Sequence, residues 1–91
     1  MEFEWDNNKN ESNKDKHKIS FERASKVFED SDKVTYESDK KDFGEKRFIV
    51  VGLIFDVLYT VVYTIRETIY RIISARRANE NETKKYYESK K

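Results

Sequence analysis

Residues 48–65 contain a single charged side chain, Asp56, and this apolar stretch constrains the fold more than any other part of the chain. Ten of its eighteen residues are Val, Ile or Thr, which favour extended strands. A membrane helix is the alternative, but an aspartate at mid-span costs roughly 2.5–3.5 kcal/mol on insertion scales. Gly52 and Asp56 also bracket a turn, so we interpret the stretch as part of two strands, residues 47–52 and 57–66.

The flanking segments extend this sheet. Residues 69–76 follow the second strand so closely that residues 67–68 can only belong to a tight hairpin, and the three strands make an antiparallel meander. Residues 31–45 are polar but alternate in hydropathy, which predicts an edge strand protected by charge. Aromatic and acidic side chains alternate in residues 1–6, which is typical of a short half-buried strand.

Capping residues mark three helix starts. Asp6 can cap a polar helix over residues 7–17, and Ser20 can cap a short amphipathic helix that ends near position 30. Asn79 and Glu82 have the spacing of a capping box and open a helix that ends near position 89. The predicted order is therefore β-α-α-β-β-β-β-α, an α+β domain with helices on one face of an antiparallel sheet.

Composition limits the chain to one domain and excludes several kinds of site. With 91 residues, 36% hydrophobic and 41% charged, it can bury one small core, so we expect a single domain over residues 1–91. The absence of cysteine excludes a disulfide scaffold and a thiolate zinc site, and a single histidine disfavours a protein-only zinc site. The acidic, aromatic start lacks the pattern of a secretory signal, so we expect a cytoplasmic protein.

Positive charge is concentrated in the second half of the chain. Residues 1–46 have ten Lys or Arg and thirteen Asp or Glu, whereas residues 47–91 have nine and five. Arginine forks match the oxygens of phosphate groups, which suggests an anionic partner for the second half. The alternative is that these side chains are simply solvated. Five of the six arginines lie in this half: Arg47, Arg66, Arg71, Arg76 and Arg77.

The chemistry that remains is metal-independent acid–base and electrostatic catalysis. The carboxylates lack the spacing of metal ligands, and there is neither a glycine-rich phosphate loop nor a G-x-S-x-G nucleophile turn. We therefore expect no cofactor and no metal. RNA suits such a protein because its 2′-hydroxyl is a built-in nucleophile, so the protein need only position the backbone, move protons and stabilise charge on phosphate.

The hairpin register decides which of the basic side chains share a face. A loop with an even number of residues groups Thr64, Arg66 and Arg71, whereas an odd loop groups Thr64 and Arg66 with Ser74 and Arg76. Thr64 and Arg66 are common to both alternatives and are the safest candidates for a functional face. Arg66 could equally be a solvated hairpin arginine.

Two other candidates have structural interpretations of their own. His17 lies at a predicted helix end, where it would interact favourably with the helix dipole. Tyr63 lies on an apolar strand, which is more typical of a core residue than of a catalyst.

The sequence resembles the BrnT family of toxins from bacterial type II toxin–antitoxin modules over nearly its whole length. The matching pieces occur in the family's order and spacing, and the main ones are Phe3-Glu4-Trp5-Asp6, Lys16-His17, Ile19-Ser20-Phe21-Glu22, Gly44-Glu45, Arg47-Phe48, Val61-Val62-Tyr63-Thr64 with Arg66, and Arg71-Ile72-Ile73-Ser74-Ala75-Arg76-Arg77-Ala78 with Glu82.

The resemblance implies a RelE-like fold and a ribonuclease that blocks translation and growth. It also implies neutralisation by a ribbon-helix-helix antitoxin called BrnA, contact with operator DNA only through that antitoxin, and no membrane association. We expect a hetero-oligomer of toxin and antitoxin. No residue is assigned as the general base. The expected catalytic residues are Arg66, Arg76, His17, Glu45 and Tyr63, and those expected to bind RNA are Arg47, Thr64, Arg71, Arg77 and Lys16.

Four departures from the family pattern bear on activity. Lys18 and Glu67 each stand in place of a glycine, and lysine is costly where a turn needs a left-handed backbone. Asp56-Val57 replaces Gly-Arg, and Thr83 replaces an arginine. Because the two lost arginines and the added glutamate lower the positive charge, a second hypothesis is a catalytically weak interaction protein that serves as antitoxin partner and co-repressor.

Overall fold

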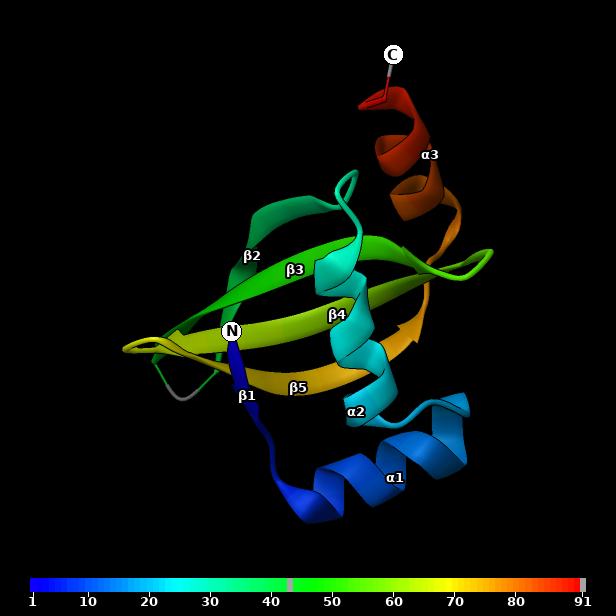
Figure 1. Ribbon diagram of the computed structural model, residues 1–91. Coiled ribbons are helices and arrows are strands. Elements are labelled where there is room, and N and C mark those ends of the chain that lie inside the picture. Colours follow the sequence, from blue (N-terminus) through cyan, green and yellow to red (C-terminus); the bar gives the residue numbers. More distant parts are fainter. Residues whose placement is uncertain (43, 91) are drawn as a thin grey trace.

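The computed structural model describes residues 1–42 and 44–90, which form the predicted order of elements (Figure 1). The second predicted helix is a short α-helix that tightens into a 3₁₀ turn, labelled η1. In chain order the elements are β1 (Glu2–Glu4), α1 (Asn7–His17), α2 (Phe21–Ala24), η1 (Ser25–Glu29), β2 (Val34–Asp42), β3 (Glu45–Ile54), β4 (Val57–Arg66), β5 (Ile69–Arg77) and α3 (Glu80–Glu88).

The five strands form one mixed sheet in the order β1-β5-β4-β3-β2. Strands β2 to β5 are an antiparallel meander, as predicted. The prediction of a wholly antiparallel sheet is wrong for β1, which pairs with β5 in parallel. Two parallel neighbouring strands require a long crossover, and here almost the whole domain lies between β1 and β5. Hydropathy alone does not specify such a pairing.

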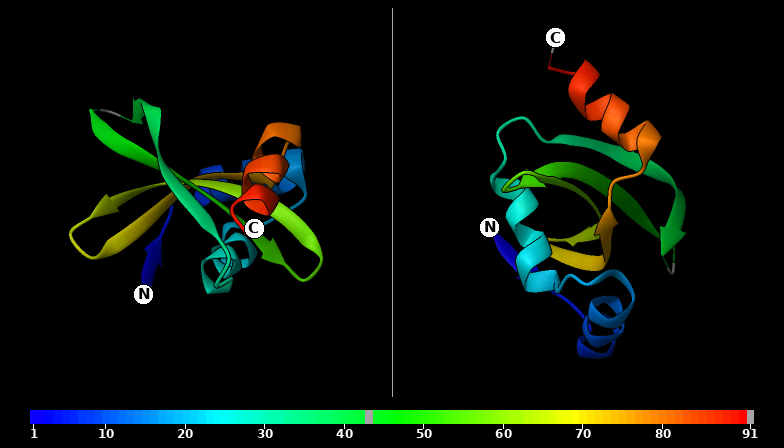
Figure 2. Two further views of the ribbon diagram at one scale, coloured as in Figure 1. Left: turned by 90° about the horizontal axis from the view of Figure 1, so that it is seen from above. Right: turned by 90° about the vertical axis from the view of Figure 1, so that its right-hand side faces the viewer.

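One face of the sheet, which we call the helix-covered face, holds the hydrophobic core beneath α2 and η1 (Figure 2). Alternate residues of β3, β4 and β5 point to this side, and Val50, Val61 and Ala75 are fully buried there. Gly52 allows η1 to approach β3, because a Cβ atom at this position would lie 2.9 Å from the carbonyl oxygen of Val27. The core is thus a single layer between the sheet and two short helical turns.

Helix α3 begins against the opposite face, which corrects the prediction that all helices share one face. The hydroxyl of Thr60 donates to Glu82 of α3, and Thr60 alternates with the core residue Val61 along β4. Farther along α3, the Tyr86 hydroxyl donates to Asp30 at 2.6 Å. Glu82 and Tyr86 lie four positions apart, so one side of α3 reaches both an internal strand and the end of η1.

Left-handed backbone at three non-glycine residues shapes the turns: Lys18, Phe55 and Glu67. Lys18 ends α1 with a φ of 60°, so the tight turn after α1 forms despite the lysine. Phe55 and Glu67 each occupy the first position of a two-residue hairpin loop, the place that type II′ turns give to glycine.

The apolar stretch that suggested a possible membrane helix is folded as strands. Residues 48–65 lie in β3, β4 and the turn between them. Among the helices of the described residues, none combines the length and hydropathy needed to cross a membrane.

Candidate active site

A β-bulge brings both predicted sets of polar side chains onto the same face. Near the β4–β5 turn Arg66 pairs with Ile69 and Thr64 with Arg71, so the loop has two residues and the even register is confirmed there. Beyond one extra residue in β5 the register shifts, and Thr60 pairs with Arg76. Residues paired across strands point to the same side. We call this surface the arginine face, and its polar members include Arg47, Thr60, Thr64, Arg66, Arg71, Ser74 and Arg76.

Two arginines of this face are tied to carboxylates that sequence reasoning did not pair with them. Arg66 donates to Glu45 from Nη2 at 2.7 Å and from Nε at 3.1 Å. These hydrogen bonds hold the pKa of the Glu45 carboxyl below its ordinary value. Arg71 donates to Glu4 of β1 at 2.9 Å. Both carboxylates therefore fix the position of an arginine in the absence of any ligand.

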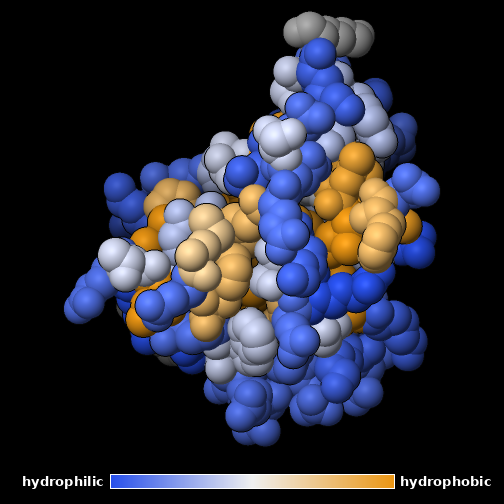
Figure 3. Space-filling view, viewed as in Figure 1, coloured by the Kyte–Doolittle hydropathy of each residue, from blue (hydrophilic) through white to orange (hydrophobic). Residues whose placement is uncertain are grey.

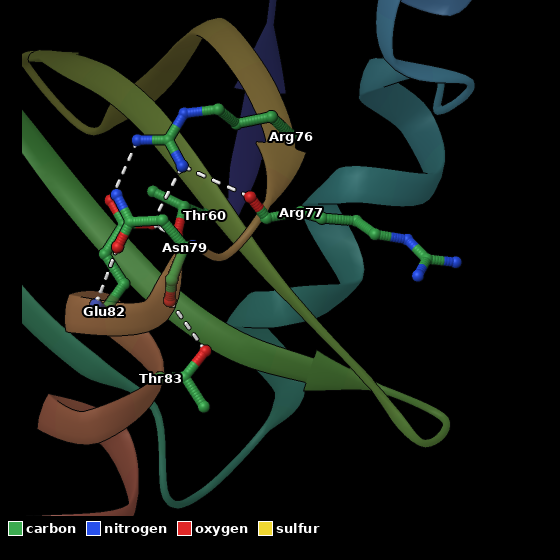
Figure 4. A network of polar contacts seen from close by, with 6 residues as sticks. All are labelled: Thr60, Arg76, Arg77, Asn79, Glu82 and Thr83. Carbon is green, nitrogen blue, oxygen red and sulfur yellow. Dashed lines mark hydrogen bonds and ion pairs between the residues drawn. The ribbon is translucent and has the colours of Figure 1, made fainter.

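A third arginine, Arg76, lies in a denser network at the start of α3 (Figure 4). Its Nη1 and Nη2 atoms each donate to Glu82 at 2.8 Å, and Nη1 also donates to the carbonyl oxygen of Arg77. Burial raises the pKa of Glu82, but hydrogen bonds from Arg76, Asn79 and Thr60 outweigh it and lower the pKa to about 2. The pKa of Arg76 is raised chiefly by its hydrogen bonds to Glu82.

Arg47 and Thr64 differ from the other members because their buried polar atoms lack partners. The Arg47 Nε atom and the Thr64 Oγ1 atom are both inaccessible and make no hydrogen bond among residues 1–42 and 44–90. Phe48 pairs with Tyr63 across β3 and β4, and continuing that register by one residue places Arg47 opposite Thr64. Two unsatisfied donors are thus neighbours on adjacent strands.

Four predicted site residues lie away from the arginine face. Lys16 and His17 end α1, where Lys16 is exposed and His17 half-buried. Arg77 pairs with Tyr59 on the other side of the sheet, and its side chain points away from Arg76 in Figure 4. Tyr63 is buried in the core against Phe28, Phe48 and Tyr70, and burial raises its pKa to about 12.

A hollow of about 670 Å³ lies elsewhere, beside α2 and η1. Its lining residues include Arg23, Leu53 and the exposed Phe55. Figure 3 shows apolar side chains gathered at the β3–β4 turn on this side. Within the residues the structure describes, no three His, Asp or Glu side chains are grouped as a metal site requires.

A mixed five-stranded sheet with a helix-covered core and an opposite face lined by arginines defines a small α+β protein suited to an anionic ligand. The chain belongs to the BrnT family, because the model of the ribonuclease toxin BrnT of type II toxin–antitoxin systems matches residues 5–82. Membership implies ribonuclease activity, an RNA target and an antitoxin partner. No curated protein matches the chain.

Proposed function

We propose that the protein is the toxin of a type II toxin–antitoxin module, an endoribonuclease that cleaves RNA through the 2′-hydroxyl without a metal ion. Cleavage inhibits translation and growth. A BrnA-like ribbon-helix-helix antitoxin neutralises the enzyme in a hetero-oligomer and alone contacts operator DNA. The family supports the ribonuclease and the antitoxin partner, and the arginine face supports the chemistry.

The observation that supports this proposal most directly is the pair of unsatisfied donors at Arg47 and Thr64. Leaving a buried polar group without a partner costs about 1–3 kcal/mol. Folded proteins keep few such groups, and a site that awaits a ligand is one explanation for them. Both atoms are inaccessible in this structure, so a phosphodiester accepts hydrogen bonds from them only when the Arg47 side chain shifts and uncovers the pair.

Of the surfaces that carry predicted site residues, we therefore assign the arginine face as the proposed active site. After that shift Arg47 and Thr64 bind the scissile phosphate, while Arg66 and Arg76 stabilise the negative charge that develops on it. Glu45 orients Arg66. Arg71 binds the RNA backbone next to the scissile phosphate.

The remaining candidates are given smaller roles. Tyr63 is a poor proton donor or acceptor at neutral pH, since its pKa is about 12. Lys16, His17 and Arg77 lie off the arginine face and would contact RNA away from the cleaved bond.

Removing the Arg47 guanidinium tests the proposal. Arg47→Ala should lower the rate of RNA cleavage by about 10²–10³, the usual effect of losing one charge-stabilising donor. Arg23→Ala is the matched control, because Arg23 is an exposed arginine of α2. The measurement is cleavage of total RNA by purified protein with and without a chelator, together with growth after induction. Equal activity of Arg47→Ala and wild type would contradict the assigned site, and loss of wild-type activity with chelator would contradict metal independence.

One observation favours the second candidate, a catalytically weak protein that acts as antitoxin partner and co-repressor. Three arginines of the face are already ion-paired, with Glu45, Glu4 and Glu82. A face neutralised in this way attracts RNA less strongly. This candidate predicts a stable complex with the antitoxin but no cleavage by the isolated chain, so robust cleavage would dismiss it.

A further inference from the structure

Glu82 is the point at which three elements of the fold meet. It is 7% exposed, and its carboxylate accepts hydrogen bonds from Thr60 of β4, Arg76 of β5 and the backbone N–H of Asn79 before α3. All of these bonds are 2.8 Å long. A carboxylate with this many donors is held in one orientation, and Figure 4 shows it lying between the strands and the first turn of α3.

This arrangement uses only part of the Arg76 guanidinium. The end of the fork, formed by Nη1 and Nη2, is bonded to Glu82, and the second hydrogen of Nη1 is directed to the carbonyl of Arg77. The structure records no bond from Nε of Arg76 to the described residues. Nε–H and the remaining Nη2 hydrogen form the lateral edge of the guanidinium, a fork that matches two oxygens of a phosphate.

We infer that Glu82 is a positioning residue that presents this lateral edge of Arg76 to the scissile phosphate, a role that rests on the proposed function. The side chain of Arg76 is 38% exposed, so its free edge can be reached, whereas the side chain of Glu82 is 10% exposed and does not itself meet RNA. Without Glu82, the flexible arginine would sample other rotamers and lose its alignment.

The same carboxylate completes the capping box of α3. Asn79 accepts from the backbone N–H of Glu82, and Glu82 accepts from that of Asn79. The start of α3 and the orientation of Arg76 therefore depend on one side chain. A capping role alone would require only a hydrogen-bond acceptor, which glutamine also provides, while the role toward Arg76 requires both carboxylate oxygens.

Glu82→Gln separates these two roles. Its amide oxygen can still accept from Thr60 and Asn79, but its NH₂ group replaces the oxygen that faces Nη2 of Arg76. We expect kcat for RNA cleavage to fall by up to about 10²-fold with little change in KM, because a misplaced group affects the transition state most. Asn79→Ala is the matched control, since it weakens the cap and leaves the Glu82–Arg76 pair intact, so its kcat should stay within about twofold of wild type.

A double variant provides an independent readout. If Glu82 acts through Arg76, then Glu82→Gln combined with Arg76→Ala should be no slower than Arg76→Ala alone. Two results would overturn the positioning role and leave the proposed function standing. The first is full activity of Glu82→Gln when Arg76→Ala is impaired. The second is an equal loss of activity in Glu82→Gln and Asn79→Ala. Failure of the wild-type chain to cleave RNA would overturn the proposed function itself, and full activity of Arg76→Ala would overturn the role given to Arg76.

Discussion

The two faces of the sheet differ in how completely their buried groups are packed and hydrogen-bonded. On the helix-covered face, Phe28 lies within 5.1–5.4 Å, centroid to centroid, of the rings of Phe3, Tyr63 and Tyr70, and among the described residues no buried side-chain polar atom on that face lacks a hydrogen-bond partner. On the arginine face, Arg47 and Thr64 keep buried donors without partners. The first arrangement stabilises the fold, whereas the unsatisfied donors of the second cost stability, and the proposed function places the site where that cost is found.

The largest effect should come from the helix-covered face. Phe28→Ala removes a ring that contacts three others and should lower the free energy of unfolding by about 3–5 kcal/mol, the usual cost of such a cavity. Urea denaturation followed by circular dichroism would measure it. Phe55→Ala is the control, because Phe55 is 83% exposed and its loss should change stability by about 0.5 kcal/mol or less. Similar losses for both phenylalanines would remove the distinction between the faces.

Acid should lower the free energy of unfolding by protonating Glu82, which binds Arg76 of the arginine face. The pKa of Glu82 is about 2 in the folded protein against an ordinary value of 4.5. Because the folded-state pKa is depressed, the stabilisation is complete above about pH 5, is lost as the pH falls toward about 2, and amounts to about 3 kcal/mol. Unfolding free energies measured across this range should show the loss.

Glu82→Gln provides the control for this pH dependence. The variant should be less stable at neutral pH and should lose less stability on acidification. Asp30 also has a lowered pKa, because its hydrogen bonds from Tyr86 and the backbone outweigh the effect of burial, so part of the slope should persist. An unchanged slope in Glu82→Gln would show that the carboxylate is not the group that titrates.

A smaller effect of opposite sign is expected at Thr64. Thr64→Val replaces an unsatisfied buried hydroxyl with a methyl group and should raise the free energy of unfolding by about 1 kcal/mol while slowing RNA cleavage. Thr60→Val is the matched control, because the Thr60 hydroxyl donates to Glu82 at 2.8 Å and its loss should destabilise the protein. Thermal melts and cleavage assays would measure both. A destabilised Thr64→Val would indicate that its hydroxyl is satisfied in solution.

The smallest effect concerns the turns. Lys18→Gly should stabilise the protein by about 0.5 kcal/mol, because glycine relieves the left-handed backbone but loses more entropy on folding. Glu67→Gly, in the β4–β5 hairpin at the end of the arginine face, should stabilise the protein by a similar amount. Paired thermal melts would compare them, and destabilisation of either variant would mean that the original side chain makes a contact worth more than the strain.

Much of the architecture is predictable from local sequence patterns. The caps at Asp6, Ser20 and Asn79 give the three helix starts, and the β-branched composition of residues 48–65 distinguishes two strands from a membrane helix. These features depend on residues close together in the chain. The parallel pairing of β1 depends on a partner far away and was missed for that reason.

The site was predicted less completely. The register alternatives for Arg71 and Arg76 were each right for one half of β5, because the bulge between them has no marker such as glycine in the sequence. The pairing of Glu4 with Arg71 joins residues 67 positions apart. Glu82 was recognised as a cap, but its second role follows only from the position of Arg76 in three dimensions.

The distance along the chain between β1 and β5 has a consequence for the order of folding. Strands β2 to β5 are joined by short connections, whereas β1 must close a loop of almost the whole domain, which carries a larger entropic cost. Contacts of this separation form late. We therefore expect the meander to fold with Arg71 still unpaired, and the N-terminal strand to supply its carboxylate as one of the last steps of folding.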